Sequence, residues 1–210
     1  MKLKRCISVR WLAVAAFLMT LTVSVGRADV VTFSGLAGAN GSGFTTYTEG
    51  TFTVTPTLGS WFQGQIYGNP TPSIFDGPAF SPGNATIMVT DSAGLFTFGA
   101  VDYSSNNGAS TFDIMGFLGG VLQFDQSGGL VASLPPFFGF TTLASGFSNS
   151  IDTLFIKVLP GAGVTSINLD NINVTTVPQN VPEPASIVLL GSGLIGLAGA
   201  IRRRKRALSV

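Results

Sequence analysis

The chain has 210 residues, of which 45% are hydrophobic and 10% are charged, with one cysteine and no histidine. Without histidine, Ser-His-Asp and Cys-His catalysis and histidine-dependent metal sites are excluded, because no other side chain has an unperturbed pKa near neutrality. Residues 29–201 hold one lysine against ten carboxylates, a formal charge of −9, and this balance argues against nucleic-acid binding, which needs a basic surface.

Residues 1–28 have the three-part pattern of a secretory signal peptide. A basic segment, residues 1–10, precedes the apolar run 11–25, and Gly26 and Ala28 are small residues at positions −3 and −1 of a cleavage site. The run is shorter than the roughly 20 residues that span a bilayer, which favours a cleaved signal over a retained anchor. The cysteine, Cys6, precedes the run, which disfavours a lipoprotein signal. We therefore predict export through the Sec translocon and cleavage by signal peptidase before Asp29.

Residues 29–176 are predicted to form an all-β domain, a jelly-roll-like β-sandwich. The region is rich in Gly, Thr, Ser, Asn and Phe, and short alternating apolar segments are separated by turn residues. About ten strands are expected, a number typical of a jelly roll, and the segments 35–43 and 68–83 are expected to be loops. The expected strands are 30–33, 51–55, 65–67, 86–90, 95–103, 111–117, 121–124, 137–142, 152–159 and 166–174.

Aromatic and amide side chains gather in one stretch of this domain. Sugar binding needs exposed aromatic rings for stacking and polar side chains for the hydroxyl groups. Trp61 and Tyr67 stand among Gln63, Gln65 and Asn69 and are therefore candidate sugar-binding residues. The alternative for Trp61 is a position in the core.

Carboxylates are the groups left for catalysis in this domain. Glycoside hydrolysis needs only two of them, and Asp91, Asp102, Asp113 and Asp125 are numerous enough. Their spacing does not show that any two converge. We therefore predict a non-enzymatic domain, with a secreted carbohydrate-active enzyme that uses an Asp pair as the alternative.

Asp170 is a candidate ligand of a structural calcium ion. It lies in a segment where polar and apolar residues nearly alternate, and calcium takes oxygen ligands from Asp, Asn and backbone carbonyls. The segment resembles the terminal strand of jelly-roll carbohydrate-binding and galactose-binding-like modules, in which an acidic residue can bind calcium. The alternative is an exposed strand residue.

The chain ends with a motif, an apolar run and a basic cluster, in that order. Residues 177–186 form a linker containing Pro182, Glu183 and Pro184, residues 187–201 are the predicted transmembrane helix, and residues 202–210 are a basic cytoplasmic tail. Because proline neither continues a helix nor donates a backbone hydrogen bond, the motif is expected to stay extended, which suits recognition by a protease. Basic residues remain on the cytoplasmic side of a membrane and act as a stop-transfer signal: Arg202, Arg203, Arg204, Lys205 and Arg206.

These three elements resemble the C-terminal signal of PEP-CTERM sorting-domain proteins. The resemblance implies that an exosortase-type transpeptidase cleaves near Pro182 to Pro184 and releases the protein or transfers it to the cell surface. Such proteins are typical of Gram-negative bacteria that make exopolysaccharide and biofilm matrix. A plain tail anchor is the alternative.

Together these features predict an exported, non-enzymatic surface or extracellular-matrix protein. It is expected to be anchored transiently in the inner membrane through its C-terminal helix, processed by the exosortase, and associated with exopolysaccharide or biofilm. Polysaccharide is the expected extracellular partner. A permanently tail-anchored periplasmic binding module is a further alternative.

Overall fold

The structure, a computed structural model, describes residues 28–77, 82–135, 139–178 and 191–196. The chain divides into two units, Met1–Pro178 and Gln179–Val210. Residues 191–196 are helical, and none of the helices within the described ranges has the length and apolar character needed to cross a membrane. The predicted signal segment up to residue 27, the Pro-Glu-Pro motif and the basic cluster lie outside the described residues.

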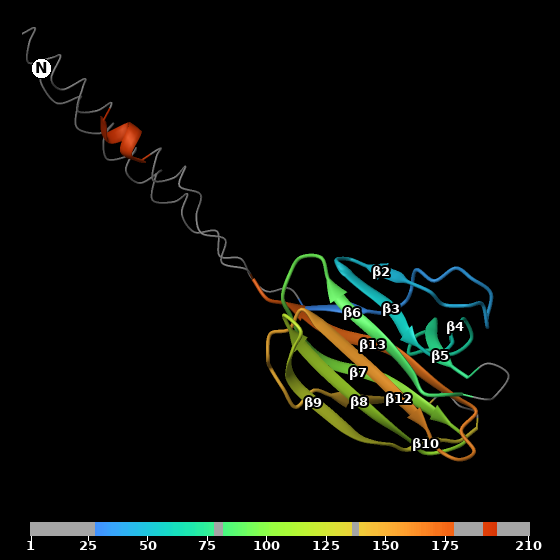
Figure 1. Cartoon of the computed structure of the whole chain (residues 1–210). Helices are drawn as coiled ribbons and strands as arrows, with labels where there is room; N and C mark the ends of the chain where they lie inside the picture. Colours follow the sequence, from blue (N-terminus) through green and yellow to red (C-terminus); the bar gives the residue numbers. More distant parts are fainter. Residues whose placement is uncertain (1–27, 78–81, 136–138, 179–190, 197–210) are drawn as a thin grey trace, which may run out of the picture. The chain divides into compact units, whose positions relative to one another are not determined.

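Two sheets pack face to face in the first unit, which confirms the predicted all-β sandwich (Figure 1). Sheet A has the strand order β10-β7-β13-β5-β4, with β1 beside β13 and β11 beside β7, and sheet B has the order β2-β3-β6-β12-β8-β9. Sheet A consists of β1 (Ala28–Val31), β4 (Trp61–Gly64), β5 (Ser73–Asp76), β7 (Phe96–Asn106), β10 (Ala132–Ser133), β11 (Thr141–Ala144) and β13 (Ser166–Thr176). Sheet B consists of β2 (Tyr47–Glu49), β3 (Phe52–Leu58), β6 (Ala85–Asp91), β8 (Ser110–Leu118), β9 (Val121–Leu130) and β12 (Thr153–Pro160).

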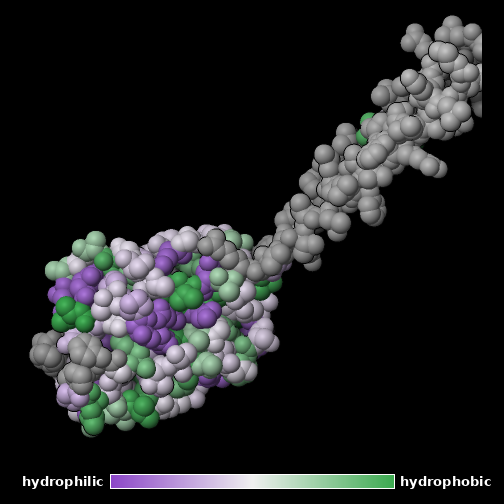
Figure 2. Space-filling model, turned by 180° about the vertical axis from the view of Figure 1, so that it is seen from behind, coloured by the Kyte–Doolittle hydropathy of each residue, from purple (hydrophilic) through white to green (hydrophobic). Residues whose placement is uncertain are grey.

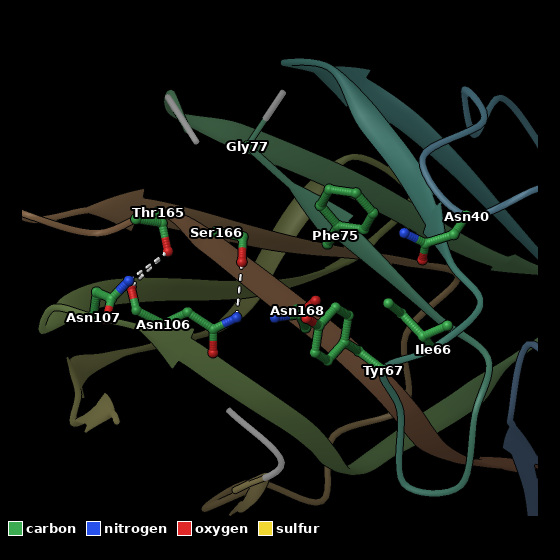
Figure 3. Close-up of a pocket in the computed structure, with 10 residues that line it drawn as sticks. All are labelled: Asn40, Ile66, Tyr67, Phe75, Gly77, Asn106, Asn107, Thr165, Ser166 and Asn168. Carbon is green, nitrogen blue, oxygen red and sulfur yellow. Dashed lines mark hydrogen bonds between the residues drawn. The ribbon is translucent and has the colours of Figure 1, made fainter. Parts of the chain in front are cut away.

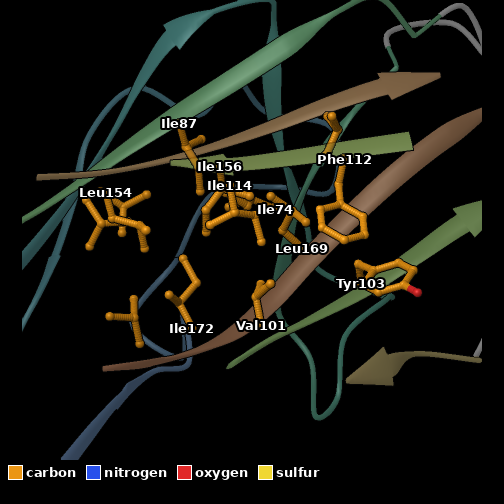
Figure 4. Close-up of a cluster of buried hydrophobic side chains, with 14 of the residues drawn as sticks. Ile74, Ile87, Val101, Tyr103, Phe112, Ile114, Leu154, Ile156, Leu169 and Ile172 are labelled. Carbon is orange, nitrogen blue, oxygen red and sulfur yellow. The ribbon is translucent and has the colours of Figure 1, made fainter. Parts of the chain in front are cut away.

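The core lies between the two sheets and follows from the period of two along each strand. On β12, Leu154 and Ile156 are at most 1% exposed, whereas the alternate residues Thr153, Phe155 and Lys157 are half-buried. Figure 4 shows these side chains together with Ile87 from sheet B, and Val101 and Ile172 from sheet A on the other side of the cluster. Each such aliphatic side chain stabilises the fold by about 1.5–3 kcal/mol through burial.

Two expectations around the aromatic stretch are wrong. Residues 65–67 are not a strand; the strand there is β4, and the chain leaves the sheet after Gly64. The expected loop 68–83 contains β5, whose short apolar segment pairs with both β4 and β13. The flanking glycines and prolines favoured a loop, but the burial of Ile74 between two strands outweighs that local signal.

Exposed apolar residues are dispersed over the described surface. The face seen in Figure 2 shows hydrophilic and hydrophobic residues side by side, with several separate hydrophobic spots. Val121, Val131 and Leu134 are each more than half exposed, but they come from different strands and connections. A binding site is therefore better sought in the cavities of the domain than in a flat apolar patch.

Candidate functional site

Polar side chains are paired across β7 and β13 on the outer face of sheet A. Val101 and Leu169 belong to the core, so the alternate residues of both strands point to the other face. The antiparallel register places these alternate residues opposite one another, and five of the six are at most 6% exposed. We call this set the polar ladder; its pairs are Asn106 with Ser166, Ser104 with Asn168, and Asp102 with Asp170.

The connection between β4 and β5, residues 65–72, contacts the carboxylate end of the polar ladder. The backbone N–H of Asn69 donates to Asp170 Oδ2 at 2.6 Å, and its side-chain Nδ2 donates to Asp102 Oδ2 at 3.1 Å. After Asp170 the register of β13 shifts, and Asn171 takes a φ of +45°, a left-handed conformation that asparagine tolerates. This turns the Asn171 side chain toward Asp102 Oδ2, to which it donates at 2.9 Å.

A cavity of about 310 Å³ opens at the other end of the polar ladder. Figure 3 shows the rings of Tyr67 and Phe75 in the middle of its lining, between the amides and hydroxyls of β7 and β13 on one side and Asn40 and Ile66 on the other. The volume is at the lower end of the roughly 300–1,000 Å³ typical of small-molecule sites. Its lining consists of Asn40, Ile66, Tyr67, Phe75, Gly77, Asn106, Asn107, Thr165, Ser166 and Asn168.

The lining is neutral and rich in hydrogen-bonding groups. Asn106 Nδ2 donates to Ser166 Oγ at 2.8 Å, and Asn107 Nδ2 donates to Thr165 Oγ1 at 3.1 Å. Asn168 is 2% exposed, and its Nδ2 has no hydrogen-bond partner among the residues that the structure describes. Because a buried unsatisfied donor costs about 1–3 kcal/mol, this amide favours a ligand that brings an acceptor.

Of the two predicted sugar-stacking residues, the structure brings one to the cavity. Tyr67 lines it, but Trp61 is 3% exposed and its Nε1 donates to the Leu58 carbonyl at 3.2 Å. A ring buried in this way has no free face for a sugar, so this burial contradicts a stacking role for Trp61. The sequence does not single out Phe75 or the asparagines of the lining. Alternation of polar residues marks Asn106 in β7 and Asn168 in β13 as members of one face of their own strand, whereas Phe75 in β5 has no such signal.

Asp170 does not have the surroundings of a calcium ligand. Its two oxygens accept hydrogen bonds from the backbone N–H groups of Asn69 and Asn171, and Asp102 accepts from Thr142 and two side-chain amides. Calcium takes six to eight oxygen ligands at roughly 2.3–2.6 Å, whereas the groups facing these oxygens are mostly N–H donors. No group of three acidic, Cys or His ligands comes together in the described ranges. The residues therefore do not fit the ion.

Two pairs of aspartates come together in the domain, but neither pair lines one of the two cavities described here. Asp113 lies on β8 and Asp125 on β9. Burial raises the pKa of Asp113, and the hydrogen bond with Asp125 and the charge of Asp125 raise it further. Neither residue lines the first cavity or a second one of about 340 Å³ beside β7, β10 and β11, and no carboxylate lines either. Asp102 pairs with Asp170 instead, beneath residues 65–72.

Burial changes the proton affinity of two further carboxylates. Burial raises the pKa of Asp170 to about 7, against its two backbone hydrogen bonds, and the charges of Asp102 and Glu49 raise it further. Burial also raises the pKa of Asp76 to about 6, against hydrogen bonds from backbone N–H groups, including that of Gly83. Both side chains are at most 1% exposed.

Comparison with known families finds a match at the C-terminus. Residues 180–205 match the family described as the PEP-CTERM protein-sorting motif. The match covers the predicted Pro-Glu-Pro motif and nearly all of the basic cluster, and it supports export and sorting of the chain to the cell envelope or surface. No curated protein matches the chain.

Solved structures of other β proteins are similar to the first unit. A family 32 carbohydrate-binding module of C. perfringens NanJ, solved with galactose, is 16% identical, with a TM-score of 0.41 over 60% of this chain and 97% of that one. A family 29 carbohydrate-binding module from Piromyces equi is 12% identical, with a TM-score of 0.42 over 76% and 95%. A DUF4465 family protein from Bacteroides caccae is 10% identical, with a TM-score of 0.46 over 70% and 98%. The β-sandwich fold of this chain is established by its own two sheets.

Proposed function

We propose that the protein is an exported, non-enzymatic surface or matrix protein, sorted at its C-terminus by an exosortase, whose β-sandwich binds a neutral polysaccharide. The sorting half rests on the match at residues 180–205. The binding half is carried by one observation: the buried Asn168 Nδ2, which has no partner within the described ranges, belongs to the lining of a neutral cavity that also contains two aromatic rings.

The chemistry of the cavity favours neutral sugars. Sugar hydroxyls both donate and accept hydrogen bonds, and amide and hydroxyl side chains can meet both needs. Apolar faces of pyranose rings pack on aromatic rings such as Tyr67 and Phe75. No basic side chain lines the cavity to balance a uronic acid or sulfate group, and Lys157 is the single basic residue in the described ranges. In the proposed role, exopolysaccharide or biofilm matrix supplies the ligand.

Binding is tested with the full chain in mild detergent, by affinity electrophoresis in gels that contain galactomannan, dextran or alginate. We expect retardation by at least one of the two neutral polymers and none by anionic alginate. Asn168→Ala should weaken neutral-polymer binding up to about tenfold, the value of one hydrogen bond at the upper end of its usual range. The exposed Asn149 provides the matched control, and Asn149→Ala should bind like the wild type.

The stability of Asn168→Ala separates a binding role from a structural one. The substitution removes an unsatisfied buried donor, so the free energy of unfolding should fall by less than the cavity alone would cost. A variant that binds normally, or a wild type retarded only by alginate, would contradict the binding proposal. Release of reducing sugar from either neutral polymer would instead support the enzymatic alternative.

Sorting is tested on the native protein from its own host. Intact mass and C-terminal peptide mapping of the membrane and extracellular fractions should show loss of the residues after about Pro182. A mass that extends to Val210 in the membrane fraction would contradict processing and support the permanently anchored periplasmic module.

A further inference from the structure

The outer face of sheet B has apolar side chains at its centre. Leu154 of β12 belongs to the core, so Phe155 points to the outer face. The register sets Met88 of β6 and Met115 of β8 on either side of Phe155. Phe117 of β8 packs edge-on against Phe155, with the ring centroids 5.7 Å apart. We call these four half-buried side chains the sheet B patch: Met88, Met115, Phe117 and Phe155.

The composition of the sheet B patch is typical of a protein–protein interface. Methionine and phenylalanine are enriched where proteins meet, and methionine adapts its shape to a partner. Both methionines of residues 29–201 are in the patch. Neither the cavity on sheet A nor the second cavity beside β10 and β11 includes a residue of the patch, so a broad surface fits it better than a small ligand does.

Opposite charges lie next to the sheet B patch. Lys157 follows Phe155 on the same face, and Asp113 of β8 is opposite Lys157 in the register. The remaining charged side chain of this face within the described strands, Asp125, is exposed on the edge strand β9, where water solvates it. A surface with both signs side by side can match a second copy of itself, whereas a surface of one sign repels it.

We propose that two copies of the chain pack face to face through their sheet B patches, about a twofold axis that runs along the strands between β12 and β8. This axis sets β12 of one copy over β8 of the other, so Lys157 meets Asp113 of the second copy. In the same way Phe155 meets Met115 of the second copy. Each contact occurs twice, so two lysines and two aspartates alternate in sign beside apolar patches that are removed from water.

The size of this contact is that of a weak dimer. The axis also sets β6 over β9, so the four neighbouring strands β6, β12, β8 and β9 of each copy overlap (Figure 1). With strands about 4.8 Å apart and about 3.4 Å per residue, and with eight residues in β12, the contact measures about 19 Å by about 27 Å. That is about 500 Å² of each copy and about 1,000 Å² in total, the lower limit for a specific interface. We therefore expect a dissociation constant in the micromolar range.

The dimer carries two binding cavities, a consequence that rests on the proposed function. The cavity opens on the outer face of sheet A, through Asn106, Ser166 and Asn168, whereas the dimer buries the outer face of sheet B. The two cavities therefore lie on opposite sides of the dimer, where each can hold a separate polysaccharide chain. Two linked sites gain avidity for a repetitive polymer, and such a dimer cross-links polymer chains, which a single domain cannot do.

Sedimentation velocity of the full chain in mild detergent, at increasing micromolar concentrations, tests the dimer. We expect the wild type to pass from monomer to dimer. Lys157→Glu and Asp113→Lys each set like charges across the contact, and each variant alone should stay monomeric. Asn173→Lys, at an exposed residue of β13 in sheet A, is the matched control and should dimerise like the wild type.

Mixing the two charge variants separates a contact between chains from an effect within one chain. Lys157 and Asp113 are also neighbours within the chain, so each variant changes its own fold as well, and mixing does not repair such a change. In a mixed dimer both contacts again join opposite charges, so the mixture should dimerise although neither variant does alone. In the wild type, carbodiimide cross-linking of isotope-labelled with unlabelled chains should join Lys157 to Asp113 in peptide pairs of mixed label.

Two outcomes count against the dimer. A wild type that stays monomeric throughout would overturn it. A dimer that both charge variants retain, or mixed-label cross-links that involve only other residues, would place the contact elsewhere and overturn the role of the sheet B patch.

Affinity electrophoresis in galactomannan or dextran tests the bivalent role. At a loading concentration where the wild type is a dimer, the apparent affinity of Lys157→Glu for the polymer should be at least about tenfold lower, because the avidity of two linked sites is lost. The mixed charge variants should regain it. Equal affinity of monomer and dimer would overturn cross-linking. If neither polymer binds, the proposed function fails, and the sedimentation data still decide the dimer.

Discussion

The buried carboxylates predict that the β-sandwich becomes more stable as the pH is lowered from about 7 toward 4. Asp170 is fully buried and its pKa is raised from 3.8 to about 7; Asp76 is 1% exposed and its pKa is raised from 3.8 to about 6. In the unfolded chain both ionise near their ordinary value. Between the two pKa values the folded state therefore holds more protons than the unfolded state, and the free energy of unfolding decreases as pH rises.

The size of the effect follows from the same values. One unit of pKa corresponds to about 1.4 kcal/mol, so Asp170 alone gives a difference on the order of 4 kcal/mol between pH 4 and pH 8. Asp76 acts with the same sign in the pH range below about 6. Below about pH 4 both carboxyls are protonated in either state, and this contribution stops changing.

Urea denaturation at pH 5 and pH 8, followed by Trp fluorescence, measures this difference. We expect a higher unfolding midpoint at pH 5, with an unchanged dependence on urea concentration. Asp170→Asn should remove most of the difference, whereas Asp152→Asn, at a carboxylate that accepts a hydrogen bond from the Gly119 N–H, should keep it. A wild type that is equally or less stable at pH 5 would refute the reasoning.

Two pairs of substitutions test the packing of the sandwich by urea denaturation. Leu154→Ala, in the core between the sheets, should lower the free energy of unfolding by about 2–5 kcal/mol. Leu122→Ala, at a side chain that is 50% exposed, should lower it by less than about 1 kcal/mol. Equal losses of stability in the two variants would contradict the assigned core. Gly116→Ala would place a Cβ 2.2 Å from the Phe124 ring and should lower the free energy of unfolding by about 1–3 kcal/mol. At Gly129 an added Cβ meets no atom within 4 Å, so Gly129→Ala should change stability little. The reverse order would contradict the packing of β8 on β9.

The sequence predicts β7 and β13 well because their alternation extends over many residues, whereas β9 continues to Leu130, six residues beyond the expected 121–124. The expected 166–174 and 95–103 correspond to β13 and β7, each 11 residues long. Short strands are different. β5, with four residues between prolines, exists because β4 and β13 bury it from both sides, and such tertiary pairing leaves no local pattern.

The candidate site was only partly visible in the sequence. The closeness of aromatic and amide residues in the chain indicates Tyr67, which lines the cavity, and equally Trp61, which is buried. The pairing of Asp102 with Asp170 and of Ser104 with Asn168 depends on the register of β7 against β13, two strands about sixty residues apart. Alternation shows that these polar residues share a face of their own strand, but only the register shows which of them meet.

The first strand of the domain, β1, pairs with the end of β13 that lies away from the cavity. β13 begins at Ser166, in the cavity lining, and ends at Thr176, where β1 pairs with it through Ala28 and Thr175. The eleven residues of the strand put these two points roughly 33 Å apart. Asp29, the residue that follows the predicted signal cleavage, therefore lies at the end of β13 that is far from the cavity. Removal of the segment before Asp29 should for this reason leave the proposed binding unchanged.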